Sequence, residues 1–206
     1  TFTYPFTDSF RAQVGLNINK TQYDFHDLYN SGEENKSASK SFDAILSPSL
    51  TLNYTLSREI RLFANISHGF SNPSLQETGM NYELGGRLFL LDDKLGIDAT
   101  LYRMDIKNLL VAQRVGNDQY VGKNAGSSRH QGLELGLNYD FQATPNLQIT
   151  PFFNYTFSDD NFVDFVDGDN DYSGNPLTGV PRNRIDSGLQ LWHTAGFYWN
   201  TTWQYV

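Results

Sequence analysis

The chain has 206 residues, a formal net charge of -8 and no cysteine. The lack of cysteine excludes a disulfide framework and a thiolate metal site. The acidic balance argues against a nucleic-acid partner, because phosphate binding needs a basic surface. Mean hydropathy is -0.48, and no stretch approaches the roughly 20 apolar residues of a membrane-spanning helix. The 12 Tyr and 15 Phe suit strands and the aromatic girdles of membrane barrels.

The chain reads as extended segments joined by connections of two lengths. The segments are predicted at 10–23, 42–56, 60–70, 80–90, 95–111, 130–141, 147–157, 182–192 and 196–205. Short links are expected at 57–59, 91–94, 142–146 and 193–195, and longer ones at 24–41, 71–79, 112–129 and 158–181. Short inner turns alternating with long outer loops are typical of an outer-membrane barrel, whereas soluble sandwiches show no such order.

Apolar and polar residues alternate along several of these segments. In segment 130–141, Leu133, Leu135 and Leu137 share a parity opposite to that of Glu134 and Asn138. A period of two indicates a strand. A soluble sheet with one wet face gives the same pattern. Length favours the membrane, because globular strands average about 5–6 residues and tilted membrane strands need about 9–11.

Three positions interrupt this alternation. Pro48 and Pro151 lack a ladder donor, so we expect a bulge or a strand end at each. In segment 95–111, Arg103 and Asp105 occupy the same alternate positions, and hence the same predicted face, as the apolar Leu101. Either a bulge switches the face there, or the strand leaves the bilayer and its outer part is wet.

Nine strands do not complete a bacterial barrel, because such barrels close with an even strand number and open edges are not tolerated in lipid. The first and last residues also lie inside strand-like patterns, and no signal peptide is visible. We therefore expect a consecutive portion of a larger barrel, occupying the whole of residues 1–206.

Five sequence elements resemble the barrel of TonB-dependent outer-membrane receptors. They are 69–77 (GFSNPSLQE) followed by 82–87 (YELGGR), 101–109 (LYRMDIKNL), 124–126 (NAG) followed by 131–134 (QGLE), and 179–182 (GVPR). The resemblance implies a 22-stranded barrel with an N-terminal plug, of which the plug, the TonB box and the closing strands are not in this sequence. The resemblance also implies that the protein is a transport receptor and not an enzyme. It implies uptake of a scarce nutrient, most often a ferric siderophore, with cobalamin, haem and glycans as other options. Energy would come from the TonB–ExbB–ExbD complex, which such a receptor contacts through its plug region.

The fold and the resemblance place the protein in the bacterial outer membrane, with outer-membrane lipid and lipopolysaccharide as partners. Two other functions stay open on the sequence alone: a passive porin or other outer-membrane barrel, and a soluble β-sandwich that binds carbohydrate. An upstream plug would favour the receptor. Solubility without detergent would favour the sandwich.

The acidic loop 158–181 is a candidate metal site. Asp167, Asp169 and Asp171 occupy alternate positions, and calcium prefers several such oxygens. The Glu that closes an EF-hand loop is missing, so that motif is not met. The alternative is a solvated loop rich in turn-forming residues.

Candidate ligand contacts lie in two loops. Phe162, Phe165 and Tyr172 either anchor a ligand or pack their own loop. Loop 112–129 and its edge carry basic and aromatic residues suited to an anionic ferric complex, namely Arg114, Tyr120, Lys123, Arg129 and His130.

Glu83, Arg87 and Glu134 are expected on the lumen face in a structural role. The four histidines show no ligand spacing for haem or zinc. No nucleophile elbow or Ser–His–Asp order indicates catalysis.

Overall fold

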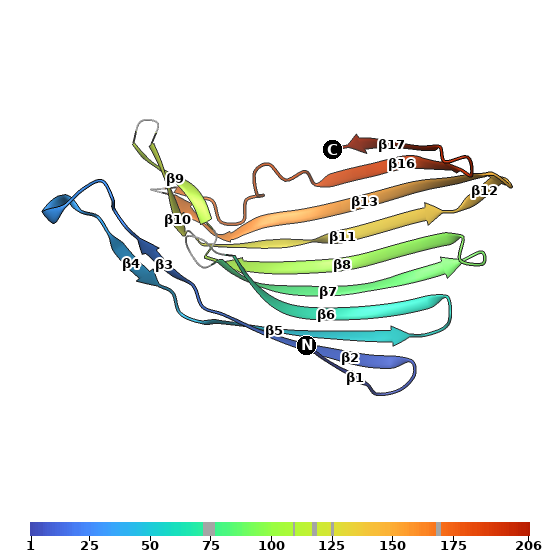
Figure 1. Ribbon diagram of the computed structural model, residues 1–206, viewed down its shortest axis with the longest axis horizontal. Coiled ribbons are helices and arrows are strands. Elements are labelled where there is room, and N and C mark those ends of the chain that lie inside the picture. Colours follow the sequence, from blue (N-terminus) through green and yellow to red (C-terminus); the bar gives the residue numbers. More distant parts are fainter. Residues whose placement is uncertain (72–76, 109, 117–118, 125, 168–169) are drawn as a thin grey trace.

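A computed structural model describes residues 1–71, 77–108, 110–116, 119–124, 126–167 and 170–206. Its main feature is one antiparallel sheet in which successive large strands are neighbours (Figure 1). In spatial order these strands are β1 (Phe2–Pro5), β2 (Phe10–Asn19), β5 (Ile45–Thr55), β6 (Ile60–Ser71), β7 (Glu77–Leu90), β8 (Leu95–Lys107), β11 (Ser127–Tyr139), β13 (Leu147–Asp164), β16 (Asn183–His193) and β17 (Tyr198–Tyr205). Strand β12 (Phe141–Thr144) pairs with β13 beside this path.

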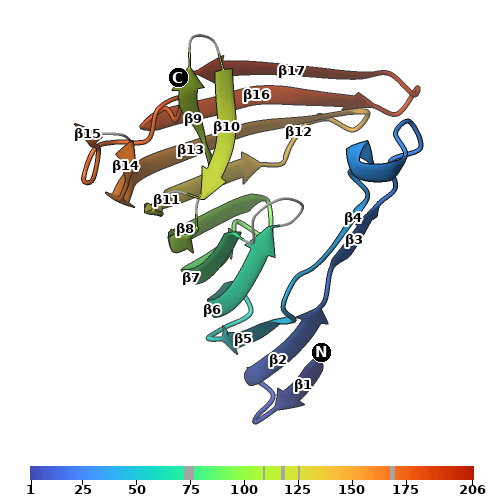
Figure 2. The same cartoon turned by 90° about the vertical axis from the view of Figure 1, so that its left-hand side faces the viewer.

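Smaller elements lie in the connections. They are the hairpins β3 (Gln22–Phe25) with β4 (Ala38–Ser41), β9 (Leu110–Gly116) with β10 (Gln119–Asn124), and β14 (Val166–Asp167) with β15 (Asn170–Asp171), and the 3-10 turn η1 (Gly32–Glu34). All three hairpins lie at the end of the sheet where the long connections gather, and the short turns lie at the other end (Figures 1 and 2). Within the described ranges, no helix is long and apolar enough to cross a membrane.

The predicted all-β antiparallel architecture is confirmed. The strands follow one another round an arc, and the two edge strands β1 and β17 lie far apart (Figure 2). The described sheet is therefore open, as a partial barrel would be. All nine predicted segments correspond to strands. Of the ten strands on the main path only the short β1 was missed, but the three hairpins and β12 lie largely in segments that were predicted as connections.

Two predicted loops are shorter than expected. Strand β11 already begins at Ser127, and β13 continues to Asp164. Both extensions are rich in polar residues, so the apolar alternation that marks the membrane part of a strand is lost there. The hydrogen-bonded ladder nevertheless continues, because a strand outside the bilayer needs no apolar face.

The strand register lines up apolar side chains across the sheet. One row runs Leu52, Ala64, Leu84, Leu101, Leu133 and Phe157 from β5 to β13. We call the surface that carries this row the outward face. Leu84 and Leu101 on it are 60% and 56% exposed, and Ala12 is the single buried hydrophobic residue in the described part of the chain. A single layer with so little core and so large an apolar face requires lipid as its solvent.

The opposite surface, which we call the inner face, is polar and closely packed at its glycines. A Cβ on Gly85 would lie 2.5 Å from the ring of Phe63, and one on Gly188 would lie 2.5 Å from that of Phe152. In each case the glycine stands directly opposite the phenylalanine in the register. Glycine therefore makes room for an aromatic ring folded flat across the neighbouring strand.

The two prolines end ladders without forming bulges. The β5–β6 pairing includes no residue of β5 before Ser49, which follows Pro48, and the β11–β13 pairing includes no residue of β13 before Phe152, which follows Pro151. Each proline is nevertheless in register with its other neighbouring strand. The missing N–H thus falls where one ladder stops, which is the strand-end alternative.

Strand β8 contains no bulge. Its register with β7 and with β11 is unbroken from Leu95 to Lys107. Arg103 and Asp105 therefore stay on the outward face with Leu101, which is the arrangement expected if the strand leaves the bilayer at that point.

Candidate binding surfaces at the long-loop end

A buried polar network occupies the inner face near the long loops. The Ser128 hydroxyl lies 3.0 Å from Nε2 of His130, whose Nδ1 lies 3.3 Å from Oδ2 of Asp160. Tyr102 and Ser158 share a second hydroxyl contact of 3.0 Å nearby. The register explains the meeting, because His130 stands opposite Asp160 and Ser128 follows the same parity.

This network has the atom order of a hydrolase triad, which sequence order alone did not reveal. Catalysis requires that the serine oxygen reach a substrate carbonyl. Ser128 is only 1% exposed, so no substrate can approach it. The network therefore holds β11 and β13 together at the base of the loops. Asp160 Oδ1 is buried without a hydrogen-bond partner among the described residues.

The three candidate aromatic residues beyond this network form one stack. The ring centroids of Phe162 and Phe165 are 4.7 Å apart, and those of Phe165 and Tyr172 are 5.5 Å apart. Backbone hydrogen bonds fix the stack, since the Tyr172 N–H donates to the Phe165 carbonyl at 2.8 Å. Phe162 lies on β13 and not in a loop. Tyr172 is 39% exposed and is the ring of the stack most open to solvent.

One carboxylate of the acidic loop, that of Asp171, is held by a neighbouring serine. Asp171 accepts a 2.9 Å hydrogen bond from the Ser173 N–H, and the Ser173 hydroxyl and N–H together lower the pKa of Asp171. Asp167 stands opposite Asn170 in the β14–β15 hairpin. Asp169 lies outside the described residues. No group of three metal-binding side chains occurs within the described ranges, and calcium in this loop stays a prediction.

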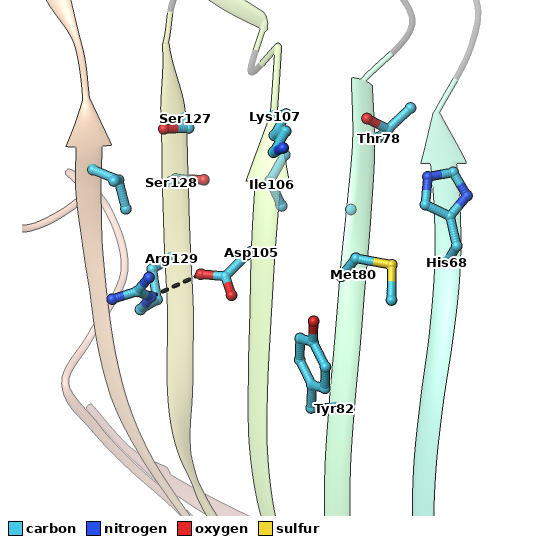
Figure 3. Close-up of a pocket in the computed structure, with 12 residues that line it drawn as sticks. His68, Thr78, Met80, Tyr82, Asp105, Ile106, Lys107, Ser127, Ser128 and Arg129 are labelled. Carbon is cyan, nitrogen blue, oxygen red and sulfur yellow. Dashed lines mark hydrogen bonds and ion pairs between the residues drawn. The ribbon is translucent and has the colours of Figure 1, made fainter. Parts of the chain in front are cut away.

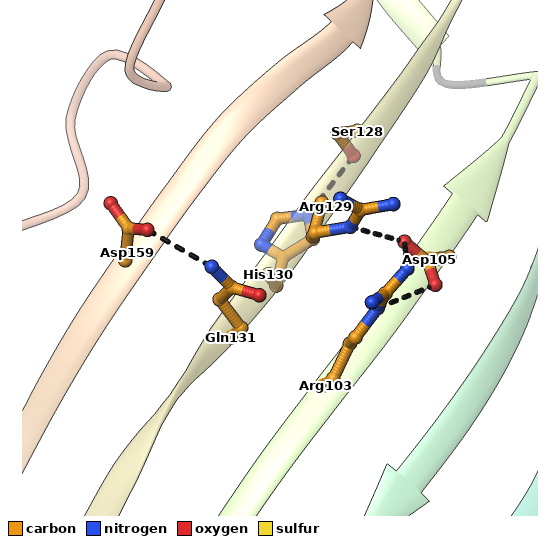
Figure 4. Close-up of polar contacts among 7 residues, drawn as sticks. All are labelled: Arg103, Asp105, Ser128, Arg129, His130, Gln131 and Asp159. Atoms are coloured by element: carbon orange, nitrogen blue, oxygen red, sulfur yellow. Dashed lines mark hydrogen bonds and ion pairs between the residues drawn. The ribbon is translucent and has the colours of Figure 1, made fainter. Parts of the chain in front are cut away.

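The basic and aromatic residues predicted for loop 112–129 and its edge lie in two different places. Arg114 and Tyr120 stand opposite each other in the β9–β10 hairpin, where only the backbone is described. Arg129 lies on β11 instead of in a loop. It shares the outward face with Leu133, and its Nε donates to Asp105 Oδ1 at 2.7 Å (Figure 4). It therefore points away from the interior in which a ligand would be enclosed.

Arg129 belongs to a charged cluster on the outward face. Asp105 accepts from Arg129 through Oδ1 and from Arg103 through Oδ2, the latter at 2.9 Å. The Gln131 amide donates to Asp159 on the neighbouring strand at 3.0 Å (Figure 4). A cavity of about 460 Å³ opens beside Asp105 and Arg129 (Figure 3). These residues continue the outward face beyond the apolar band.

The expected lumen residues share the inner face. Arg87 pairs with Asp98 at 2.7 Å on the next strand, and Glu83 lines with Arg87 a cavity of about 600 Å³. Glu134 lines a neighbouring cavity that also contains Arg87 and Asp98. These contacts suit a polar wall that meets water or another polar segment.

An open meander with an apolar outward face, a polar inner face and long loops at one end defines a segment of an outer-membrane barrel. The family model "TonB dependent receptor-like, beta-barrel" matches residues 1–206, and the chain belongs to that family. This membership places it in the bacterial outer membrane and in a family of transport receptors rather than enzymes. It also removes the soluble sandwich.

Individual relatives agree with this assignment. The Metal-pseudopaline receptor CntO of Pseudomonas aeruginosa is 26% identical over 188 residues, which cover 86% of this chain and 25% of that receptor. The siderophore receptor PiuA from Acinetobacter baumannii has a TM-score of 0.67 at 18% identity, covering 89% of this chain and 29% of that one. The Ferric-Catecholate import receptor Fiu from K12 E. coli has a TM-score of 0.67 at 17% identity, covering 99% and 33%. The chain thus spans about a quarter of the curated relative's length.

Proposed function

We propose that the protein is an uptake receptor for a metal–chelator complex, in the simplest case a ferric siderophore, energised through TonB. Family membership supports the receptor class. The names of CntO, PiuA and Fiu support a chelated metal as cargo. A passive porin is the competing function, and dependence on TonB separates the two.

The observation that carries the proposal is the aromatic stack at the long-loop end. Phe162 and Phe165 pack beneath Tyr172, whose ring remains open to solvent. A rigid, backed aromatic ring binds a planar or aromatic ligand at low entropic cost. Arg114 and Tyr120 of the β9–β10 hairpin belong to the same end of the sheet and would supply positive charge and a second ring to an anionic complex (Figure 1).

The test is uptake of radiolabelled ferric siderophores by iron-starved cells that express the full-length protein, with and without TonB. Accumulation above the level of TonB-deficient cells is expected for one chelator class. Tyr172→Ala should weaken binding of that chelator several-fold without changing barrel assembly. Phe197→Ala is the matched control, because Phe197 is 75% exposed in the turn 194–197 at the opposite end. Equal accumulation without TonB would support the porin and contradict the receptor.

A further inference from the structure

The aromatic stack depends on a β-bulge at the end of β13. Along a regular strand Phe162 and Phe165 would point to opposite faces, because they are three residues apart. In the β11–β13 register Phe162 and Asp164 have successive partners on β11, and Val163 between them has none. This extra residue shifts the alternation by one position. Phe165 therefore falls on the same face as Phe162, where the two rings meet.

The segment 174–177 returns along the edge of β13 that faces away from β11. It exchanges two backbone hydrogen bonds with Phe162, of 2.8 and 2.9 Å, and its Leu177 N–H donates to the Asp160 carbonyl at 2.8 Å. Tyr172 comes two residues before this segment. The position of the Tyr172 ring is therefore set by how the end of β13 is held.

The buried polar network holds this end of β13 from the β11 side. Ser128 stands opposite Phe162, and His130 stands opposite Asp160 (Ser128 and His130 are drawn in Figure 4). The Asp160 side chain is 9% exposed, and His130 is its only side-chain partner among the described residues. Asp160 thus joins β11 through its carboxylate and segment 174–177 through its main-chain carbonyl.

We infer that Ser128, His130 and Asp160 are positioning residues that hold Tyr172 in the geometry in which it binds the metal–chelator complex, an inference that rests on the proposed function. Ser128 is 1% exposed, so the network acts without touching the ligand. Loss of the imidazole would leave a buried carboxylate with no side-chain partner, which the fold relieves by moving the end of β13. A ring released in this way must be ordered again on binding, and affinity falls.

The first test is fluorine NMR of the ligand-free, full-length protein with fluorotyrosine at position 172. The ring of Tyr172 lies 5.5 Å from that of Phe165, so its resonance should be displaced from that of an exposed tyrosine. His130→Phe should return the resonance to the exposed position. His130→Gln, which can still donate to Asp160, should keep most of the displacement. An unchanged resonance in His130→Phe would overturn the inference.

Two further variants make this test specific. Ser128→Ala removes only the hydroxyl contact, so it serves where His130→Phe does not assemble, and it should shift the resonance less in the same direction. Gln131→Ala is the matched control, because Gln131 donates to Asp159 at 3.0 Å between the same two strands but on the outward face (Figure 4). An equal shift in Gln131→Ala would also overturn the inference, because it would show a general loosening of β11 and β13.

The second test is uptake kinetics with the ferric siderophore that wild-type cells accumulate. His130→Phe should raise KM several-fold and leave the maximal rate unchanged. In a Tyr172→Ala background it should add nothing, because its effect passes through Tyr172. An additive increase would show that His130 contacts the ligand itself and would overturn the positioning role. If neither Tyr172→Ala nor His130→Phe changes KM, the stack is not the ligand site and the proposed function fails there, whereas the fluorine spectrum still decides whether the network positions Tyr172.

Discussion

The two faces of this sheet are made from alternate residues of the same strands and obey opposite rules. On the outward face, Leu84 and Leu101 are more than half exposed and stand opposite each other on β7 and β8. On the inner face, three residues along, Arg87 and Asp98 form an ion pair between the same strands. The backbone ladder is common to both faces. The solvent that each face meets therefore dictates its residues. The effect of a substitution should depend first on the face that the residue occupies and only then on the chemical type of the new side chain.

The largest expected effect comes from placing a charge in the middle of the apolar band. Leu135 stands between Ala99 and Tyr155 on the outward face. Leu135→Arg should destabilise the folded full-length protein in lipid vesicles by about 2–4 kcal/mol, the cost of arginine near the bilayer midplane. The measurement is equilibrium unfolding in urea.

Glu134→Arg is its matched control, because Glu134 is the adjacent residue, exposed on the inner face. A change within about 0.5 kcal/mol is expected for an exposed site. If the two variants lose equal stability, the assignment of the faces is wrong.

A smaller effect tests the packing of the inner face. Gly85→Ala places a Cβ 2.5 Å from the Phe63 ring and 2.8 Å from the Ala99 carbonyl oxygen, and the backbone oxygen cannot move away. Overpacking of this kind costs about 1–3 kcal/mol. Gly69→Ala on β6 is the control, because no atom of the described residues lies within 4 Å of its Cβ position. The same unfolding assay should show no loss for Gly69→Ala, and a loss there equal to that of Gly85→Ala would refute the packing explanation.

Parity and length were sufficient to predict the nine long strands, their order and the two faces. The predicted strand ends were wrong where a strand extends beyond the bilayer, because the alternation of apolar and polar residues stops there. Arg129 and Phe162 were assigned to loops because their surroundings are polar, yet both lie on strands that continue beyond the apolar band. Even so, the sequence did put Arg103 and Asp105 in the same parity as Leu101. Because β8 has no bulge, that parity alone places both residues of the charged cluster on the outward face.

The inner network was beyond sequence reasoning. Ser128 and His130 are two residues apart, but Asp160 lies thirty positions further on, and only the β11–β13 register brings it opposite His130. Register across a long loop depends on the whole hairpin, so no local pattern identifies the partner. The stacking of Tyr172 on Phe165 depends on the loop returning toward β13, which local sequence does not determine either.

The Arg87–Asp98 pair should matter less than the packing change at Gly85. Its atoms are 2.7 Å apart, but the side chains are 62% and 54% exposed. An exposed pair of this kind contributes about 0.2–1 kcal/mol. A double-mutant cycle with Arg87→Gln and Asp98→Asn should give a coupling energy in that range and a decline with added salt. A coupling well above it would show that water is excluded from this part of the inner face.

The smallest effect concerns the β3–β4 hairpin, outside the bilayer. Asp27 accepts backbone hydrogen bonds from Asn30 at 3.0 Å and from Lys36 at 3.1 Å, and these bonds lower the pKa of Asp27 to about 2. Because the folded pKa is depressed, the turn is fully stabilised above the ordinary value of about 4 and loses that support as the pH falls through about 2. Carboxyl-carbon NMR should show this titration, and Asp27→Asn should abolish it. A midpoint near the ordinary value would mean that the carboxylate does not hold the turn in solution, and that the hairpin is ordered by its strand pairing alone.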